Sequence, residues 1–198
     1  MICEEKQYID IHIPKCGGTS RVEAFRELGL LVGPDHLRHA MAKELRYGKD
    51  HLKRPWDDYY SIAVFRHPYD LYVSLYHYRR DRLEEENYHN IPEHVSFEQW
   101  MMEHVADPRQ VLPEELTDCL CFIEGQQGEI LVDDIFTLDQ IDEAWEKVCH
   151  HIGMKIDLPR TNTTEHKPAR SYFEGKNHLK SIVWGNCWRA LPVFNWEI

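Results

Sequence analysis

Six consecutive residues in the stretch IPKCGGTS are suited to binding an anion. The stretch follows a short apolar run, and its lysine stands immediately before two glycines and two hydroxyl residues. A tight glycine turn between a strand and a helix directs backbone N–H groups into one small space at the positive end of the helix dipole, which is a phosphate-type site. The residues predicted to form it are Lys15, Cys16, Gly17, Gly18, Thr19 and Ser20.

The position of this lysine differs from that in loops that bind ATP or GTP. In the pattern G-x-x-x-x-G-K-[ST] the lysine follows the glycines, and the next hydroxyl residue binds magnesium. Here Lys15 precedes Gly17 and Gly18, and the next buried apolar run ends in Arg66 rather than in an acidic residue. We therefore expect a second anion at this site, and no metal. The alternative is a simple glycine turn with a solvated lysine.

A second stretch, VFRHPYDLYVSLYHY, supplies an arginine where that second anion is expected. Arg66 ends a predicted strand, and Ser74 lies about two helical turns further on. Arginine presents a planar, permanently charged fork to a phosphate. Two anion sites at the carboxyl ends of parallel strands suit a nucleotide with phosphates at both ends of its ribose. Otherwise Arg66 pairs with an acidic neighbour, and Ser74 bonds to its own helix.

The elements that position these residues alternate between short apolar runs and helical patterns, which predicts an α/β fold with a parallel sheet. Predicted strands are residues 8–13, 28–33, 59–65 and 128–136, and predicted helices are residues 19–28, 39–47, 68–86, a helix capped by Ser96, and 138–152. A terminal helix with Trp184, Trp188, Phe194 and Trp196 is expected to pack onto the core. Residues 1–198 are expected to form a single domain.

Composition limits the partners of the chain. The net charge of −11 argues against a nucleic-acid backbone or an anionic membrane as the main partner, because both need a basic surface. No apolar run approaches the ~20 residues of a membrane span, and the first residues do not have the pattern of a signal peptide. The six cysteines follow neither a zinc nor a disulfide pattern. We expect a soluble, cytoplasmic protein with reduced thiols; oligomeric state is not readable.

The stretches IPKCGGTS and FRHPYDLYVSLY together resemble the two signature motifs of sulfotransferases that use 3′-phosphoadenosine-5′-phosphosulfate (PAPS). The similarity is greatest to the carbohydrate type, which includes the heparan sulfate 2-O and 6-O enzymes. It continues more weakly through SFEQW, EILVDDIFTLDQIDEAWEKVCHHIGM and LPRTNTTEHKP. One departure is that Thr137, Leu138 and Asp139 occupy the stretch where the family often has an arginine, an aromatic residue and a glutamate.

The resemblance implies a P-loop-like central parallel sheet flanked by helices, and transfer of a sulfonate from PAPS to a hydroxyl or amine without a metal. The loop from Gly17 to Ser20 would hold the 5′-phosphosulfate, and Arg66 with Ser74 would hold the 3′-phosphate. Lys15 would face the bridging oxygen, where negative charge builds as the sulfur–oxygen bond breaks. A carbohydrate acceptor is implied. The acidic composition argues against a highly sulfated polymer and leaves open a neutral glycan, a lipid-linked sugar or a small alcohol.

The acceptor must lose a proton as it attacks sulfur, so a base is required. Among thirteen histidines, His39 is our first choice, because His39-Ala40 leading into a helix resembles the segment in which the 6-O enzymes carry a catalytic histidine. His36 is the reserve. The alternative is that both are ordinary surface histidines.

Two other functions remain open. The first is a small-molecule kinase or nucleotide phosphotransferase, and the second is a non-catalytic nucleotide-binding module, motivated by the missing arginine near Thr137. The late loop TNTTEHKPAR either closes over the nucleotide, using Lys167 or Arg170, or is a plain surface loop.

Overall fold

The computed structural model describes residues 1–30, 32–81, 90–107, 118–161 and 166–198. The chain divides into two compact units. Unit 1 comprises Met1–Arg66 and Leu120–Asn162, and unit 2 comprises His67–Cys119 and Thr163–Ile198. The expectation of a single domain stays a prediction.

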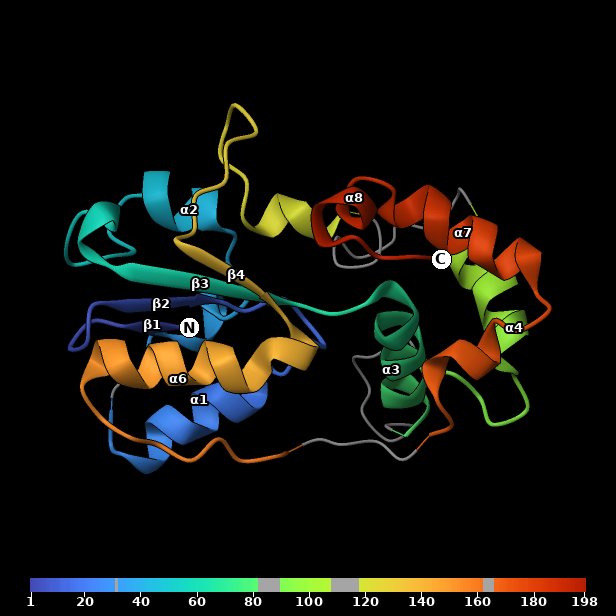
Figure 1. The fold of residues 1–198 in the computed structure, drawn as a ribbon, viewed down its shortest axis with the longest axis horizontal. Helices are drawn as coiled ribbons and strands as arrows, with labels where there is room; N and C mark the ends of the chain where they lie inside the picture. Colours follow the sequence, from blue (N-terminus) through green and yellow to red (C-terminus); the bar gives the residue numbers. More distant parts are fainter. Residues whose placement is uncertain (31, 82–89, 108–117, 162–165) are drawn as a thin grey trace. The chain divides into compact units, whose positions relative to one another are not determined.

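Unit 1 is built on a sheet of four strands in the order β1-β2-β3-β4 (Figure 1). The central strand β3 is parallel to both of its neighbours, with Ser61 opposite Ile9 of β2 and Val64 opposite Phe136 of β4. β1 adds an antiparallel edge that the sequence analysis did not anticipate. The predicted α/β class is therefore confirmed, with a mixed and mostly parallel sheet. The strands are β1 (Ile2–Cys3), β2 (Tyr8–Ile11), β3 (Tyr60–Phe65) and β4 (Asp134–Thr137).

The strand predicted at residues 28–33 is wrong for its described part, which excludes residue 31. Gly29 takes a positive φ of 71° directly after the preceding helix and turns the chain. Beyond it, the Gly33 N–H donates to the Ile2 carbonyl at 2.7 Å. β1 is only two residues long, so its outer edge is too short a ladder for this run to extend along. Leu30 and Val32 instead pack against the core.

Helices α1 (Gly18–Glu27) and α6 (Ile141–Ile152) cover one face of the sheet in unit 1, as Figure 1 shows, and α2 (Ala42–Tyr47) lies on the other side. The core between α1, α6 and the sheet is aromatic. Phe25 of α1 stacks on Tyr8 of β2 at 5.3 Å between ring centroids and meets Trp145 of α6 edge-on at 6.0 Å. Because α1 packs on β2 through Phe25 and Tyr8, both ends of the loop that connects them, residues 14–20, are held in place.

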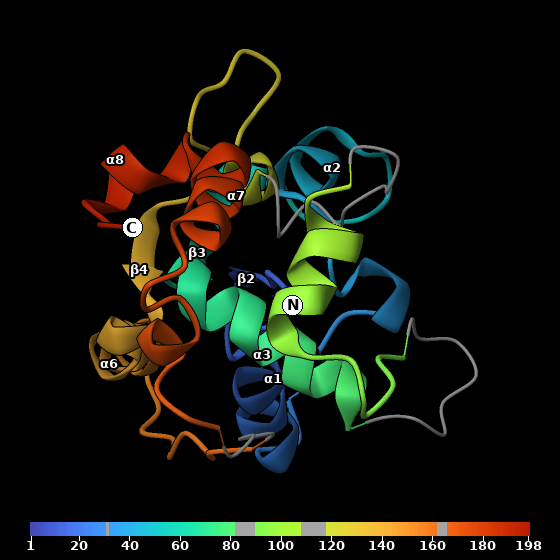
Figure 2. The ribbon, with the colours of Figure 1, turned by 90° about the vertical axis from the view of Figure 1, so that its right-hand side faces the viewer.

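Unit 2 is helical (Figure 2). Its longest helix, α3 (Pro68–Arg80), begins at Pro68 as predicted, and Ser96 caps the next helix by accepting the Gln99 N–H at 3.1 Å. Tyr76 of α3 packs edge-on against Phe97 at 5.4 Å, which joins these two helices. The helix capped by Ser96 is α4 (Phe97–Trp100), which a π-helical turn (Met101–Val105) continues. Among the described residues of unit 2, α7 (Asn177–Cys187) and α8 (Ala190–Phe194) follow.

The expectation that the aromatic tail packs onto the core is wrong for two of its tryptophans. Trp184 and Trp188 are 60% and 58% exposed. The buried side of α7 is formed by Leu179, Val183 and Cys187, which are four residues apart and share one face. Each tryptophan follows one of these residues directly, so it points away from that face.

Single helical turns lie between these elements. None of the six cysteines, all of which are within the described ranges, forms a disulfide. These turns are Asp35–Leu37, Trp56–Asp58, Cys119–Phe122, Leu138–Gln140 and Ala169–Tyr172. Within the described ranges, none of the helices combines the length and the apolar character needed to cross a membrane. The far end of the helix predicted over residues 68–86 lies outside the described residues beyond residue 81.

Candidate functional site

A buried ion pair holds the glycine loop, residues 14–20, in place. Arg21 of α1 donates from Nε and Nη2 to the two carboxylate oxygens of Asp10 on β2, at 2.5 and 3.0 Å, and neither side chain is more than 1% exposed. Its Nη1 donates to the Cys16 carbonyl at 2.9 Å. Burial opposes ionisation of Asp10, but the charge and hydrogen bonds of Arg21 hold the pKa of that carboxyl below its ordinary value. One guanidinium therefore joins the strand, the loop and the helix.

The loop backbone is turned so that α1 starts with free N–H donors. Lys15 and Gly17 have positive φ angles of 63° and 74°. Gly17 precedes the first residue of α1, no side chain caps that end, and the first turn carries no acidic residue. The first N–H groups of a helix have no partner within it and form the positive end of its dipole. This end of α1 is chemically suited to an anion, and the binding of an anion there stays a prediction.

The two glycines are required for different reasons. Gly17 adopts a positive φ that residues other than glycine rarely adopt. Gly18 has an imidazole directly over its Cα, because a Cβ there would lie 2.2 Å from Nε2 of His12. Leu138 is the nearest neighbour of Gly17, since a Cβ at that glycine would lie 3.2 Å from its Cδ1. The departure from the family pattern at residues 137–139 therefore places an apolar side chain beside the loop.

Arg66 reaches the loop from the neighbouring parallel strand. It directly follows β3, and its Nη1 donates to the Lys15 carbonyl at 3.1 Å. The structure thus brings the two sequence motifs together at the same edge of the sheet. Ser74 is buried on α3, which belongs to unit 2, so its predicted role beside Arg66 stays a prediction. Lys167 and Arg170 belong to unit 2 as well, and residues 162–165 of the same late loop lie outside the described residues.

Arg38 is a third arginine that contacts the loop, after Arg21 and Arg66, and the sequence analysis did not predict it. Nη2 of Arg38 donates to the Thr19 hydroxyl at 2.8 Å, and its Nε is buried without a hydrogen-bond partner among the described residues. The Ser20 hydroxyl lies 3.0 Å from that of Thr161. The only sequence signal for Arg38 was its place directly before His39, since contact with residue 19 depends on the turn at residues 35–37.

His39 is held against the end of β2. Its Nδ1 lies 3.0 Å from the His12 carbonyl oxygen, and the two imidazole rings meet edge-on at 4.7 Å. A carbonyl can only accept, so Nδ1 of His39 carries the proton and Nε2 keeps a lone pair. Partial burial lowers the pKa of His39 from its ordinary value, which favours the neutral ring. His39 therefore has the tautomer of a base at Nε2. His36 lies on the adjacent turn and is exposed.

His12 is a buried polar side chain beneath the loop. It is 4% exposed, and its Nδ1 has no hydrogen-bond partner among the described residues. Burial lowers the pKa of His12 to about 2. The ring is therefore neutral near pH 7 and acts as a spacer between β2 and Gly18. Little in the sequence singles out His12, because it continues the apolar run of β2 and is one of thirteen histidines.

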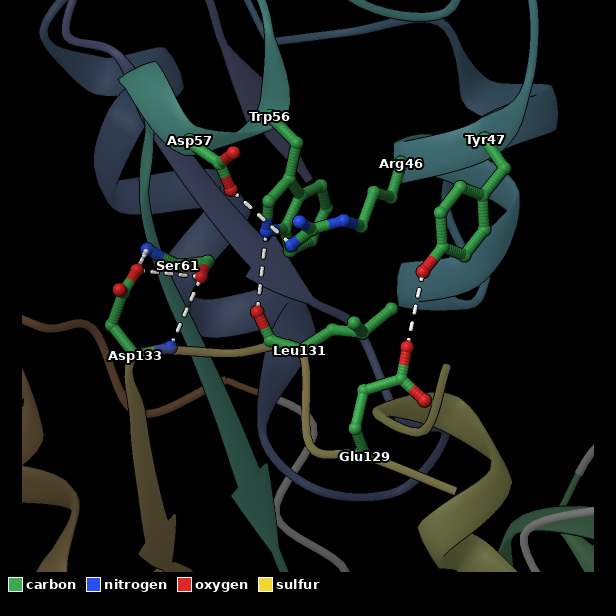
Figure 3. A network of polar contacts seen from close by, with 8 residues as sticks. All are labelled: Arg46, Tyr47, Trp56, Asp57, Ser61, Glu129, Leu131 and Asp133. Carbon is green, nitrogen blue, oxygen red and sulfur yellow. Dashed lines mark hydrogen bonds and ion pairs between the residues drawn. The ribbon is translucent and has the colours of Figure 1, made fainter. Parts of the chain in front are cut away.

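A separate network fixes α2 in unit 1 (Figure 3). Nε1 of Trp56 donates to the Leu131 carbonyl at 3.2 Å, and Arg46 pairs with Asp57 at 3.2 Å. Tyr47, at the end of α2, donates its hydroxyl to Glu129 at 3.1 Å. These contacts tie the helix that follows His39 to the segment before β4.

Comparison of the chain with protein-family models, with curated proteins and with solved structures gave no match. In the part of the chain that the structure describes, no group of three or more histidine, cysteine, aspartate or glutamate residues is arranged to hold a metal ion.

The first prediction concerns the Asp10–Arg21 pair. Replacing Asp10→Asn leaves a buried guanidinium without its counter-charge and should lower the free energy of unfolding by about 3–5 kcal/mol in urea denaturation. The control is Asp35→Asn, which breaks an exposed pair with Arg26 and should cost no more than about 1 kcal/mol. Similar losses in the two variants would contradict the structural role assigned to the buried pair.

The second prediction concerns His12 and pH. The unfolded chain protonates this histidine near pH 6.5, whereas the folded chain resists protonation down to about 2. Its contribution to stability is therefore complete above pH 6.5 and is lost as the pH falls; between pH 7 and pH 5 the loss is about 2 kcal/mol. His12→Asn should show a shallower fall in the free energy of unfolding over this range. The control is His150→Asn, which replaces an exposed histidine and should leave the pH dependence of the free energy of unfolding as in the wild type. A pH dependence in His12→Asn that is parallel to that of the wild type would refute the prediction.

Proposed function

We propose that this chain is a PAPS-dependent sulfotransferase of the carbohydrate type, with a P-loop-like fold. The observation that carries the proposal is the bond from Arg66 to the Lys15 carbonyl, which joins two motifs 51 residues apart in the sequence. Both follow parallel strands that are direct neighbours in the sheet. Ligands of open α/β sheets bind at this edge, outside the carboxyl ends of the strands.

In this proposal the N-terminal end of α1 binds the 5′-phosphosulfate of PAPS. The backbone N–H groups of Gly17 and Gly18 meet its oxygens, and Arg38 with the Thr19 hydroxyl supplies donors 2.8 Å apart on one side. Cys16 shapes the loop, because its side chain is buried, its N–H donates to the Ile13 carbonyl at 3.3 Å and its carbonyl accepts from Arg21. The Ser20 hydroxyl lies one residue further along α1 than Thr19. Arg66 binds the 3′-phosphate that distinguishes PAPS from ATP, and the expected contribution of Ser74, a residue of unit 2, stays a prediction.

The proposed reaction is an in-line displacement at sulfur. An acceptor hydroxyl oxygen forms a bond to sulfur while the bond from sulfur to the bridging oxygen breaks. The electron pair stays on the 5′-phosphate of the departing nucleotide. Lys15 stabilises the charge that develops there, and Nε2 of His39 takes the acceptor proton. The neutral tautomer of His39 supports this role because its lone pair is already available near pH 7.

The third prediction tests the donor site by calorimetric titration with 3′-phosphoadenosine 5′-phosphate (PAP) and with ADP, each with and without magnesium. The protein should bind PAP without magnesium and should prefer it to ADP. Losing a charge-assisted contact costs about 1.5–3 kcal/mol, so Arg66→Ala should weaken PAP binding roughly 10- to 100-fold. Arg38→Ala should weaken binding of 5′-AMP as well as PAP.

Exposed Arg54→Ala is the matched control for the loss of one positive charge and should bind PAP like the wild type. Preference for ADP with magnesium would favour the kinase or phosphotransferase hypothesis instead. Absence of binding to either nucleotide would remove the basis of the proposal.

The fourth prediction concerns the proposed base. In a ¹⁵N NMR titration, His39 should carry its proton on Nδ1 when neutral and should titrate with a pKa below 6.5, because burial of the ring disfavours the charged form. His39→Gln should keep PAP affinity and lose sulfonate transfer by about 10²- to 10⁴-fold, while exposed His150→Gln should lose neither. A neutral ring protonated on Nε2 would contradict the assignment.

A further inference from the structure

An open cleft lies directly beside His39 in unit 1. It has a volume of about 600 Å³, within the range of roughly 300–1,000 Å³ typical of small-molecule sites. One side is formed by the turn that carries His36 and His39, and the other by one face of α2. Its lining includes the side chains of His36, His39, Lys43, Glu44, Tyr47 and His51.

The face of α2 on this cleft follows from helical spacing. Lys43 and Glu44 lie four and three residues before Tyr47, so the three side chains share one side of the helix. Because α2 is anchored by Arg46 and Tyr47, its distance from the turn at His39 is fixed. The cleft is therefore a built feature of unit 1 and not a gap between loops.

The charge of the lining is balanced. It contains one lysine and one glutamate, and the Glu44 carboxylate is already engaged, because it accepts the Met41 N–H at 2.7 Å. A sulfated or uronate-rich polymer would need several cations along its path. Among the described lining residues Lys43 is the one lysine, and the whole chain carries a net charge of −11. The cleft thus disfavours a polyanion.

Tyr47 offers a fixed aromatic surface. Its side chain is directed from α2 toward Glu129, as Figure 3 shows, and the phenol donates to that carboxylate at 3.1 Å. Glu129 also accepts the Gln127 N–H at 2.9 Å, so the acceptor of this bond is itself held. Tyr47 is nevertheless 47% exposed. Arg46 lies over the Tyr47 ring, 5.9 Å from its centroid, so the ring is held both there and at its hydroxyl. A held ring that is still partly exposed can pack against an apolar ligand surface at low entropic cost.

We propose that this cleft is the acceptor site and that it takes an uncharged sugar ring. The C–H face of the sugar packs on Tyr47, its hydroxyls bond to His36, Lys43 and His51, and one hydroxyl lies at Nε2 of His39. The inference rests on the proposed function of the neighbouring glycine loop as a PAPS site. It adds the acceptor class and names Tyr47 as the residue that binds the acceptor.

The fifth prediction tests this site with defined probes. Uncharged probes are methyl β-glucopyranoside, lactose and chitotriose, and anionic probes are heparin and N-acetylheparosan oligosaccharides. Sulfonate transfer from PAPS is followed by mass spectrometry, and PAP affinity is measured in parallel. Transfer should occur to at least one uncharged probe and not to the anionic ones. Tyr47→Ala should lower kcat/KM at least tenfold, mainly through KM, with PAP affinity unchanged.

Two further variants separate binding from folding. Tyr47→Phe keeps the ring and should restore most of the kcat/KM lost in Tyr47→Ala. Trp184→Ala removes an exposed aromatic ring outside the cleft and should behave like the wild type. Thermal unfolding of each variant checks that the fold is intact.

The outcomes distinguish the two levels of the proposal. With PAP binding intact, transfer to anionic probes alone, transfer to no probe, or an unchanged KM in Tyr47→Ala each overturns the acceptor site and leaves the donor site standing. Failure of the wild type to bind PAP overturns the proposed function, and the acceptor site with it.

Discussion

The candidate site depends on one buried ion pair, Asp10–Arg21. Removing two charges from water is costly unless their hydrogen bonds are satisfied. Here two of the guanidinium N–H donors meet the carboxylate, and a third meets the Cys16 carbonyl. Because Asp10 lies on β2 and Arg21 on α1, the pair fixes the angle at which the helix leaves the sheet. The loop between them then has little freedom, which permits the positive φ angles at Lys15 and Gly17.

Around this fixed loop, other groups are held through backbone atoms and hydroxyls. Arg66 binds the Lys15 carbonyl, His39 binds the His12 carbonyl, and Arg38 binds the Thr19 hydroxyl. Two guanidinium groups and the start of a helix are thus concentrated at one edge of the sheet in a chain with a net charge of −11. A local positive site within an acidic protein favours a small anion over an extended polyanion. Preorganised donors of this kind act on charge that develops during a reaction without reorganising first.

The sequence predicted the elements with strong local signals. Alternating short apolar runs and helices gave the α/β class, Pro68 marked the start of α3, and Gly153 marked the end of α6. The loop and the strand-end Arg66 were found because their residue types and spacing carry a mechanism. Arg21 and Arg38 were missed because their partners are fixed by tertiary structure, Asp10 across the interior and Thr19 across a turn. The run at residues 28–33 was misjudged because apolarity reports burial and does not report whether the neighbouring strand is long enough to pair with; β1 has only two residues.

We propose that the glycine loop binds the phosphosulfate end of PAPS without a metal. The most direct measurement is the change in backbone amide NMR shifts when 3′-phosphoadenosine 5′-phosphate is added to the wild-type protein in the presence of EDTA. The account predicts that the amides of Gly17, Gly18 and Thr19 shift most, together with the side-chain Nε–H signals of Arg38 and Arg66. Loop amides that do not move, or that move only when magnesium is supplied, would contradict it.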